Sequence, residues 1–500
     1  MGTSEPVGAS PMDEADLGGC DAIQPADLTR LTVTEAARLI ETRQISPVDL
    51  TRQHLTRIRE VDPYLHAYLR VTEDRALRSA RQAEAEIVAG HYRGRLHGIP
   101  FGLKDVYDTA GIPTTGNSAA FLDRVPDRDA HAVRRLDGAG AVLLGKQATH
   151  ELTYGGVSSD LPWPPPRNPW DLSRDTGGSS SGSGAAVAAG LSMFALGTDT
   201  GGSVRNPAAH CGIVGLKPSF GLVSRSGIMA NSHTLDHCGI LARTVEDCAA
   251  VLAEVAGYDP RDPASDPGAR AFDDRSRLAG GIAGWRIGLL SHLHERDLPA
   301  SEEVRSAVSA ACLDLARLGS FVEETAISDL ARYAACKAVI QRPEIHAEYG
   351  AALERNPGLF GEKFRLRAAA GRETTAAAYL AAQAERRALT REITRLFERF
   401  DLLVTAGPYG PAPLLDDAVA SRAFDQPEIT VPFSLTRLPA LCLCIGFTGE
   451  GLPLSLLIVG PPGGDAAVLR AGHAYQSATA WHRSHPWLPN TCSERLARHD

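Results

Sequence analysis

The sequence predicts a layered α/β fold, in which a largely buried sheet lies between helices. From about residue 96 onward, short apolar runs alternate with glycine-rich turns and with longer segments of helical pattern. Apolar runs of this length are typical of strands that are covered on both faces. The expected strands are AVLLG (141–145), FALGTD (194–199), RIGLL (286–290), DLLVT (401–405), ALCLCIGF (440–447) and LSLLIVG (454–460).

Two amphipathic helices are expected before these strands. Thr32 with Glu35 forms a capping box pattern, in which each side chain accepts a backbone hydrogen bond at the start of a helix. Ser46 followed by Pro47 supplies an N-cap and a first-turn proline for the second helix. Later segments rich in Ala, Arg and Glu are also expected to be helical, over 301–318 and about 372–400.

Composition indicates a soluble globular protein. The 500 residues are 43% apolar and 22% charged, and 51 basic against 60 acidic residues give a net charge of −9. The basic residues are dispersed, which argues against nucleic acid or an anionic membrane as a partner. The acidic N-terminus has no apolar signal-peptide core, and no apolar run reaches the roughly 18 residues of a membrane span. We therefore expect a cytoplasmic protein.

The nine cysteines predict neither disulfides nor zinc. Their number is odd, they are widely spaced, and they form no C-x-x-C pair. We expect them to be reduced and mostly buried. The first 26 residues are rich in Gly, Pro, Ser and acids, which predicts a mobile tail.

Two glycine-rich loops carry the serines that are candidates for a role in catalysis. GGSSSGSGAAVAAG (177–190) runs directly into an alanine-rich helical segment, so small residues precede a helix N-terminus. In GTDTGGSVRNPAAHCGIVGLKP (197–218), Ser203 follows two glycines, and successive N–H groups in such a turn can form an oxyanion hole. Asp199 and Arg205 flank this turn and are expected to pair as a structural salt bridge.

A serine nucleophile needs a base, and no histidine is close to Ser203 in the sequence. Lys104 lies in HGIPFGLKDVYDTAGIPTTGNS (97–118), after a short apolar run and before a loop rich in Thr and Gly. A single lysine is usually a solvated surface group, so its position alone does not indicate catalysis.

Together, these three segments resemble the amidase signature family. The stretch from Gly177 to Ala208 matches the long Gly/Ser pattern of that family without a gap, and Ser179 and Ser203 have the family's spacing. Further matching segments occur in the family's order: GIPFGLKD (98–105), THELTYGG (149–156), GIVGLKPSFG (212–221), ARTVEDCA (242–249) and GLPLSLLIVG (451–460).

The resemblance implies a role for each of these residues. Ser203 would be the nucleophile, Ser179 a bridging serine entered through a cis peptide bond, and Lys104 the terminal base. Ser180 would support their hydrogen-bond network. The oxyanion hole would consist of the backbone N–H groups of Thr200, Gly201, Gly202 and Ser203. No metal or organic cofactor is implied.

This assignment requires an unusual lysine. Lys104 can accept a proton only when neutral, so its pKa of about 10.4 must fall by roughly 3 units, which burial in a dry pocket can achieve. Ser179 would then pass the proton between Ser203 and Lys104. Serine and lysine pairs are recognised alternatives to a histidine triad.

Three other motifs are less convincing. GAVLLGKQ (140–147) resembles a phosphate loop, but its middle is apolar and Gln147 stands where Ser or Thr should hold magnesium. GSSSG (178–182) fits a nucleophile elbow centred on Ser180, yet that motif needs a preceding strand and DLSRDTG is polar. The scattered histidines show no metal-binding pattern; they are His131, His150, His210, His233 and His237.

The chain departs from the family where substrate is expected to bind. Leu457 replaces a Gln that is common in the family, and TAGPYG (405–410) replaces a common TPT. Residues from about 328 to 380 are the least family-like. A less polar pocket is therefore expected, with bulky aryl or alkyl amides and carbamates preferred over glutamine and asparagine.

The resemblance extends from about residue 30 to 487 and implies one layered α/β/α domain with a central mixed sheet over residues 27–490. Its expected parts are N-terminal helices (27–90), a catalytic core (91–257), a variable helical part that shapes the substrate site (281–400) and a return to the sheet (401–490), followed by a tail (491–500).

The leading functional hypothesis is a hydrolase that cleaves C–N bonds of amides, with anilides, carbamates (urethanes) and esters as further substrates. The expected partner is a small-molecule substrate, and the expected assembly is a monomer or homodimer. The alternative is the glutaminase-type A subunit of a tRNA-dependent amidotransferase, which works with partner subunits. A catalytically idle scaffold is disfavoured because Lys104, Ser179 and Ser203 are all present.

Overall fold

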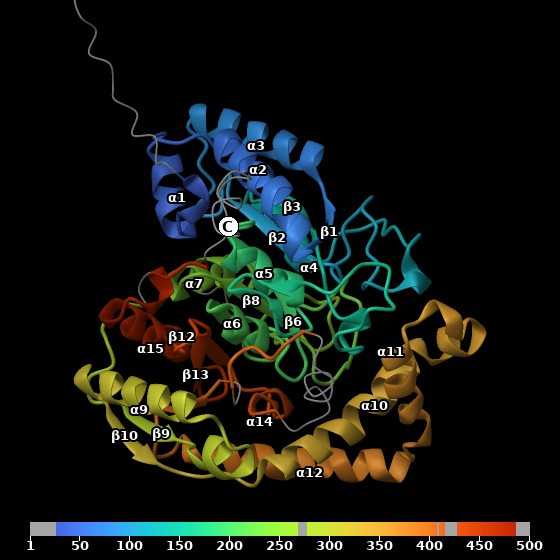
Figure 1. The fold of residues 1–500 in the computed structure, drawn as a ribbon, viewed down its shortest axis with the longest axis vertical. Coiled ribbons are helices and arrows are strands. Elements are labelled where there is room, and N and C mark those ends of the chain that lie inside the picture. Colours follow the sequence, from blue (N-terminus) through green and yellow to red (C-terminus); the bar gives the residue numbers. More distant parts are fainter. Residues whose placement is uncertain (1–26, 269–277, 408–409, 416–427, 487–500) are drawn as a thin grey trace, which may run out of the picture.

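A computed structural model describes residues 27–268, 278–407, 410–415 and 428–486, and its centre is an 11-stranded sheet (Figure 1). In spatial order the strands are β1 (Tyr68–Val71), β3 (Val142–Gln147), β2 (Pro100–Lys104), β6 (Phe194–Asp199), β8 (His237–Ala242), β7 (Val214–Lys217), β12 (Ala440–Phe447), β13 (Pro453–Val459), β11 (Leu402–Ala406), β9 (Arg286–Leu289) and β10 (Phe321–Glu324). The predicted α/β fold with a mixed central sheet is confirmed. The predicted tails (1–26 and 491–500) lie outside the described residues.

The sheet is mixed: β1 pairs with β3 in the antiparallel direction, and two groups of parallel strands flank an antiparallel middle. Strands β3, β2 and β6 are parallel, as are β11, β9 and β10, whereas the neighbours from β6 through β8, β7, β12 and β13 to β11 are antiparallel. All six apolar runs expected to be strands are strands. Five further strands, β1, β2, β7, β8 and β10, were not among them.

Helices cover both faces of the sheet. A Cβ atom added to Gly215 on β7 would lie 2.6 Å from Cβ of Ala208, so helix α6 (Arg205–Cys211) packs directly on that face. Gly215 pairs with Cys442, and side chains alternate along a strand, so Leu441 points to the opposite face. There Leu441 meets Gly472 of helix α15 (Asp465–Ala478). The central strands are therefore buried between two helical layers.

The N-terminal helices begin as predicted. Thr32 and Glu35 form the capping box of α1 (Val33–Glu41), and the hydroxyl of Ser46 accepts hydrogen bonds from two backbone N–H groups at the start of α2 (Pro47–Leu65). In Figure 1 these helices lie beside α3 (Glu73–Val88), next to the β1 end of the sheet.

The remaining helices form the other parts of the two layers and the region farthest from β1. They are α4 (His131–Gly138), α5 (Ser181–Ala188), α7 (Val245–Val255), α9 (Glu302–Arg317), α10 (Leu330–Arg355), α11 (Glu362–Ala369), α12 (Ala376–Leu396) and α14 (Val431–Leu435). Helix α10 packs against α11, α12 and α14 (Figure 1). The predicted helices over 301–318 and 372–400 correspond to α9 and α12.

One expectation about the chain before the first glycine loop is wrong. The polar segment DLSRDTG was not expected to contain a strand, but Asp171–Asp175 forms β5, which pairs with β4 (Arg167–Asn168). This pair is separate from the central sheet and partly exposed, so its residues do not need to be apolar.

The seven cysteines within the described ranges are all buried and free of disulfides. In the same ranges, no helix is long and apolar enough to cross a membrane.

Candidate active site

Lys104 is a fully buried lysine at the end of the central strand β2. Its Nζ atom lies 2.8 Å from Ser179 Oγ, 3.0 Å from Ser180 Oγ and 2.9 Å from Thr198 Oγ1. Strand β6, which carries Thr198, is the parallel neighbour of β2, and the two serines belong to the loop that enters helix α5. The structure therefore surrounds this amine with three hydroxyl groups.

This environment changes the chemistry of the amine. Burial lowers the pKa of Lys104 to about 7, although the negative charges of Asp199 and Asp236 oppose the shift. Neutral Lys104 is therefore well populated at neutral pH, and it can act as a proton acceptor.

Ser179 follows a cis peptide bond between Gly178 and Ser179. The backbone N–H of His150 donates a 3.1 Å hydrogen bond to the carbonyl of Ser179, and the imidazole of His150 lies so close to Gly178 that no Cβ atom fits there. Burial lowers the pKa of His150 to about 3, so this imidazole is a much weaker base than Lys104. The glycine loop thus places Ser179 beside the better base.

Ser180 is the N-cap residue of α5 and is fully buried. Besides its contact with Lys104, its hydroxyl lies 3.3 Å from both the carbonyl oxygen and the nitrogen of Thr198. A Cβ atom added to Gly197 would lie only 2.6 Å from Ser180 Oγ. Ser180 therefore faces the sheet and Lys104, which does not fit the exposed serine of a nucleophile elbow.

Ser203 lies in the loop between β6 and α6, with 8% of its surface exposed. Its carbonyl accepts a 3.1 Å hydrogen bond from the backbone N–H of Ser180, which joins the two glycine loops. Within the described part of the chain, the hydroxyl of Ser203 makes no hydrogen bond, and none joins it to Ser179. The structure thus brings the two loops together without closing the contact between these hydroxyls.

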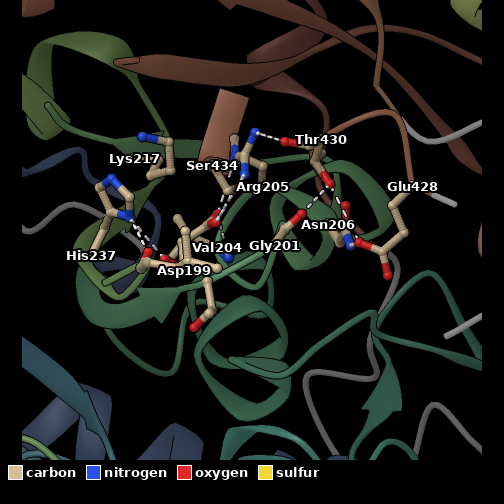
Figure 2. Close-up of polar contacts among 12 residues, drawn as sticks. Asp199, Gly201, Val204, Arg205, Asn206, Lys217, His237, Glu428, Thr430 and Ser434 are labelled. Carbon is tan, nitrogen blue, oxygen red and sulfur yellow. Dashed lines mark hydrogen bonds and ion pairs between the residues drawn. The ribbon is translucent and has the colours of Figure 1, made fainter. Parts of the chain in front are cut away.

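Around Ser203, two backbone carbonyls accept hydrogen bonds, whereas the neighbouring N–H groups have no acceptor among the described residues. The carbonyl of Gly201 accepts a 2.6 Å hydrogen bond from the Thr430 hydroxyl (Figure 2). The carbonyl of Gly202 accepts one of 2.7 Å from the N–H of Asn206. Among the described residues, no acceptor binds the N–H groups of residues 201–203. This loop therefore presents unused donors beside Ser203, as an oxyanion site requires.

The side chain of Thr200 is also held in place. Its hydroxyl donates a 2.6 Å hydrogen bond to Asp236 Oδ1. The other carboxylate oxygen of Asp236 accepts hydrogen bonds from the N–H groups of Asn231 and Ser232, at 2.8 and 2.9 Å. The turn that contains Ser203 is therefore anchored at its first residue.

Asp199 and Arg205 form the expected salt bridge, and both are fully buried. Arg205 binds the carboxylate through two nitrogens, at 2.8 and 3.0 Å, and also donates to the Thr430 carbonyl and the Ser434 hydroxyl (Figure 2). Burial alone would raise the pKa of Asp199, but Arg205 holds it well below its usual range. The pair joins the Ser203 loop to helix α14.

Glu428 lies on the other side of this loop (Figure 2). Its Oε2 atom accepts hydrogen bonds from Asn206 Nδ2 at 2.9 Å and from Thr430 Oγ1 at 3.3 Å. Burial raises the pKa of Glu428, and the charge of Lys337 opposes that rise. A second buried carboxylate is therefore hydrogen-bonded to residues that contact the same turn.

Sequence reasoning missed several of these residues. Thr430 and Ser434 contact the Ser203 loop from positions more than 200 residues away, and no local pattern distinguishes them. Thr198 had a weak signal, because it precedes Asp199 in the expected strand FALGTD. Its contact with Lys104 follows from the pairing of β2 with β6, which the sequence did not reveal.

The structure does not support the phosphate-loop motif. Lys146 lies inside strand β3, fully buried, with its Nζ atom 3.1 Å from Asp105 Oδ1 and 2.7 Å from Thr114 Oγ1. Throughout the described ranges, no group of three or more His, Cys, Asp or Glu side chains is arranged to hold a metal ion.

The residues expected to make the substrate pocket less polar do not all do so. Leu457 is fully buried in the core of β13, opposite Cys442 and Thr405, so it offers no accessible surface to a pocket. Helix α10, by contrast, brings polar side chains toward the Ser203 loop. Gln341, for example, donates a 2.7 Å hydrogen bond to the side chain of Asn231.

Comparisons with known proteins match nearly the whole chain. A family model described as Amidase matches residues 49–469. An amidase of Pseudomonas putida is 38% identical over 93% of this chain and 99% of its own. The A subunit of glutamyl-tRNA(Gln) amidotransferase from Dehalococcoides mccartyi is 35% identical over 92% of this chain and 100% of its own. The solved peptide amidase of Stenotrophomonas maltophilia has a TM-score of 0.81 and 32% identity, and the match covers 92% and 99% of the two chains.

Proposed function

The chain belongs to the amidase family of hydrolases, and on that premise we propose that it cleaves amide C–N bonds through an acyl-enzyme on Ser203. Ser179 is the proton relay and Lys104 is the base. The observation that carries this proposal is the 2.8 Å contact between Ser179 and the amine of Lys104, whose pKa burial lowers to about 7.

In the first half of the reaction, Ser203 Oγ attacks the carbonyl carbon while its proton passes to Ser179 and the proton of Ser179 passes to Lys104. The carbonyl oxygen becomes an oxyanion and accepts hydrogen bonds from the N–H groups of residues 200–203. When the C–N bond breaks, the amine leaves with a proton returned through Ser179. Lys104 is neutral again and the acyl group is bound to Ser203.

In the second half, water replaces the amine. Its proton passes through Ser179 to Lys104 as its oxygen attacks the acyl carbon, and the carboxylic acid leaves when Ser203 Oγ recovers a proton by the same route. The relay requires the hydroxyls of Ser203 and Ser179 to meet. A rotation of the Ser203 side chain brings them together, because the backbone hydrogen bond between Ser180 and Ser203 already holds the two loops side by side.

The proposed chemistry requires an acyl group in the substrate but does not select the group that leaves. An oxyanion site stabilises acyl transfer whatever group leaves, so anilides, carbamates and esters are further substrates in this proposal. The expected preference for bulky aryl or alkyl amides and carbamates over glutamine and asparagine depended on Leu457, and because this side chain is fully buried, that preference is not part of the proposal.

The proposal is tested by expressing the chain alone and measuring kcat/KM on p-nitroanilide, carbamate, ester and primary-amide substrates. Turnover of at least one amide series, abolished by Ser203→Ala, is the expected result. An inert chain across the whole panel, in a folded sample that a serine-directed fluorophosphonate does not label, would refute it.

A second candidate function is favoured by one specific observation, the 35% identity to the A subunit of an amidotransferase over that protein's full length. In that case the chain would release ammonia from glutamine only when partner subunits are present. Glutaminase activity that appears on adding such subunits, together with no turnover of simple amides by the chain alone, would favour this candidate.

A further inference from the structure

Lysine is rare in this chain and is absent from its fully exposed surface. Only five of the 51 basic residues are lysines, namely Lys104, Lys146, Lys217, Lys337 and Lys363. All five lie within the described ranges, and each is buried or half-buried. The chain therefore uses arginine for surface charge, and each lysine has a specific environment.

Four of the five lysines have a hydrogen-bond partner for Nζ in the structure. Lys104 binds hydroxyls, Lys146 binds Asp105, and Lys217 and Lys363 donate to backbone carbonyls. Lys337 differs, because no described residue makes a hydrogen bond or an ion pair with its Nζ atom.

The amine of Lys337 lies directly against the Ser203 loop. It is so close to Gly201 that a Cβ atom added to this glycine would collide with Lys337 Nζ and would lie 2.7 Å from its Cε atom. Gly201 is the centre of the segment that presents its N–H groups beside Ser203. This amine therefore lies beside the proposed oxyanion loop, although Lys337 belongs to helix α10.

Helix α10 fixes this position. Gln341 and Glu344 lie four and seven residues after Lys337, on the same face of the helix. Gln341 donates a 2.7 Å hydrogen bond to the side chain of Asn231, and Glu344 accepts one of 2.8 Å from the hydroxyl of Thr234. The face that carries Lys337 is thus docked on residues 231–234.

The same contacts continue to the oxyanion loop. The N–H of Asn231 donates to Asp236, which accepts the hydroxyl of Thr200. A continuous series of hydrogen bonds therefore links helix α10 to the first residue of the loop. Lys337 is held beside Gly201 by this series and does not reach it as a loosely tethered side chain.

The neighbouring carboxylates, Asp199 and Glu428, already have other partners. Asp199 is bound by Arg205, and Glu428 is bound by Asn206 and Thr430. Burial lowers the pKa of Lys337, and the negative charges of Glu428 and Asp199 oppose that shift. Neither carboxylate forms an ion pair with Lys337, so no acidic side chain of the described residues neutralises its ammonium.

We propose that Lys337 binds a carboxylate of the substrate, so that the enzyme prefers amides carrying an acidic group a few atoms from the scissile carbonyl. The inference rests on the proposed function and adds a substrate class to it. Withdrawing a cation from water without a partner is unfavourable, and a bound carboxylate supplies the missing charge-assisted hydrogen bond. The expected location of this carboxylate is next to Gly201, on the acyl or the leaving-group side.

Matched substrates test the proposal. The acyl side is tested with succinyl and glutaryl p-nitroanilides against alkanoyl p-nitroanilides of equal length, and the leaving-group side with acetanilides that carry a ring carboxylate or a ring methyl group. The readout is the ratio of kcat/KM for the acidic substrate to that for its neutral partner. We expect a ratio of about 10 or more in at least one series, from one charge-assisted hydrogen bond.

Variants assign the preference to Lys337. Lys337→Met should reduce this ratio about tenfold or more, Lys337→Arg should retain most of it, and Lys337→Glu should reverse it. Lys363→Met is the matched control, because Lys363 is another half-buried lysine but donates to the carbonyl of Val157. In this control the ratio should stay at its wild-type value.

Two results would overturn the proposal. One is a wild-type enzyme without preference for the acidic member of either series. The other is a Lys337→Met variant that loses activity equally on acidic and neutral substrates, which would assign Lys337 to the oxyanion or to loop structure. Failure of the proposed function itself looks different, because no aniline product would then be released from either member of any pair.

Discussion

The amine of Lys104 lies 2.9 Å from the hydroxyl of Thr198, and this threonine completes a set of three hydroxyl partners around a fully buried lysine. Hydroxyl oxygens stabilise an ammonium less than a carboxylate ion pair does. Such a lysine releases its proton more readily than the ion-paired lysines of ordinary proteins. The arrangement therefore determines how the activity should depend on pH.

We expect kcat/KM to fall about tenfold per pH unit below the pKa of Lys104 and to level off above it. Burial lowers that pKa to about 7, so the acid limb should have its midpoint near neutrality. The sign follows because the protonated amine, which predominates at low pH, cannot accept the proton of Ser179. A rate profile that is flat from pH 5 to 9 would contradict this role.

Removing the base should be costly at every pH. Lys104→Ala is expected to lower kcat/KM by at least about 10²-fold, the usual range for a lost general base. Lys104→Arg is the matched control, because it keeps the positive charge but does not deprotonate. Both variants should show this loss, and near wild-type activity in either would exclude Lys104 as the base.

Thr198→Val should move the pH profile without abolishing activity. The substitution removes one oxygen that stabilises the ammonium form, so the pKa of Lys104 should fall further and the acid limb should shift to lower pH. Thr198→Ser keeps the hydroxyl and should leave the profile near that of the wild type. An acid limb that moves to higher pH in Thr198→Val would show that this contact has a different effect.

The nucleophile can be identified by labelling. A fluorophosphonate or sulfonyl fluoride should modify one residue, and peptide mass mapping should place the adduct on Ser203. Ser203→Ala should abolish labelling and turnover, whereas Ser179→Ala should slow labelling severely without moving the adduct. An adduct on Ser180 would revive the nucleophile-elbow hypothesis, against the buried position of that hydroxyl.

The ion pair between Asp199 and Arg205 should matter for stability as well as activity. Both side chains are fully buried, so Arg205→Ala leaves an unpaired carboxylate and should lower the free energy of unfolding by about 3–5 kcal/mol. The measurement is a urea unfolding curve. A double variant with Asp199→Asn and Arg205→Met should lose less than the two single changes summed, because no charge remains unpaired. Strict additivity would argue against the pairing.

Activity should persist in excess EDTA. In the proposed mechanism the base, the relay and the oxyanion donors are all supplied by Lys104, Ser179 and the loop of residues 200–203. Loss of turnover on chelation, restored by a divalent cation, would be incompatible with that mechanism.

Local patterns in the sequence were enough to predict much of the fold. The capping box at Thr32 depends on two residues three positions apart, and the long strands β12 and β13 are continuous apolar runs. The four-residue strand β7 and the polar strand β5 lack such a pattern. Their formation depends on partners distant in sequence, which no local rule identifies.

In the candidate active site, too, local patterns predicted some residues, and contacts between distant segments place the others. The loops that carry Ser179 and Ser203 are uninterrupted motifs, and the resemblance places both, together with Lys104, in the segments that the structure brings together. Thr430 and Lys337 occur in ordinary sequence contexts. Their proximity to Gly201 results from the docking of α14 and α10, which is a property of the assembled chain.

The position of β12 and β13 in the middle of the sheet has a consequence for synthesis. The N-terminal part of a chain leaves the ribosome first, yet β7 gains its neighbour β12 only after residues 440–447 have emerged. The Thr430 hydroxyl that holds the Gly201 carbonyl also arrives late. A chain that ends before Thr430 therefore contains Lys104, Ser179 and Ser203 but lacks the hydroxyl that binds the Gly201 carbonyl. In the proposed mechanism, hydrolytic activity therefore requires residues as far as 430–447 to have been synthesised.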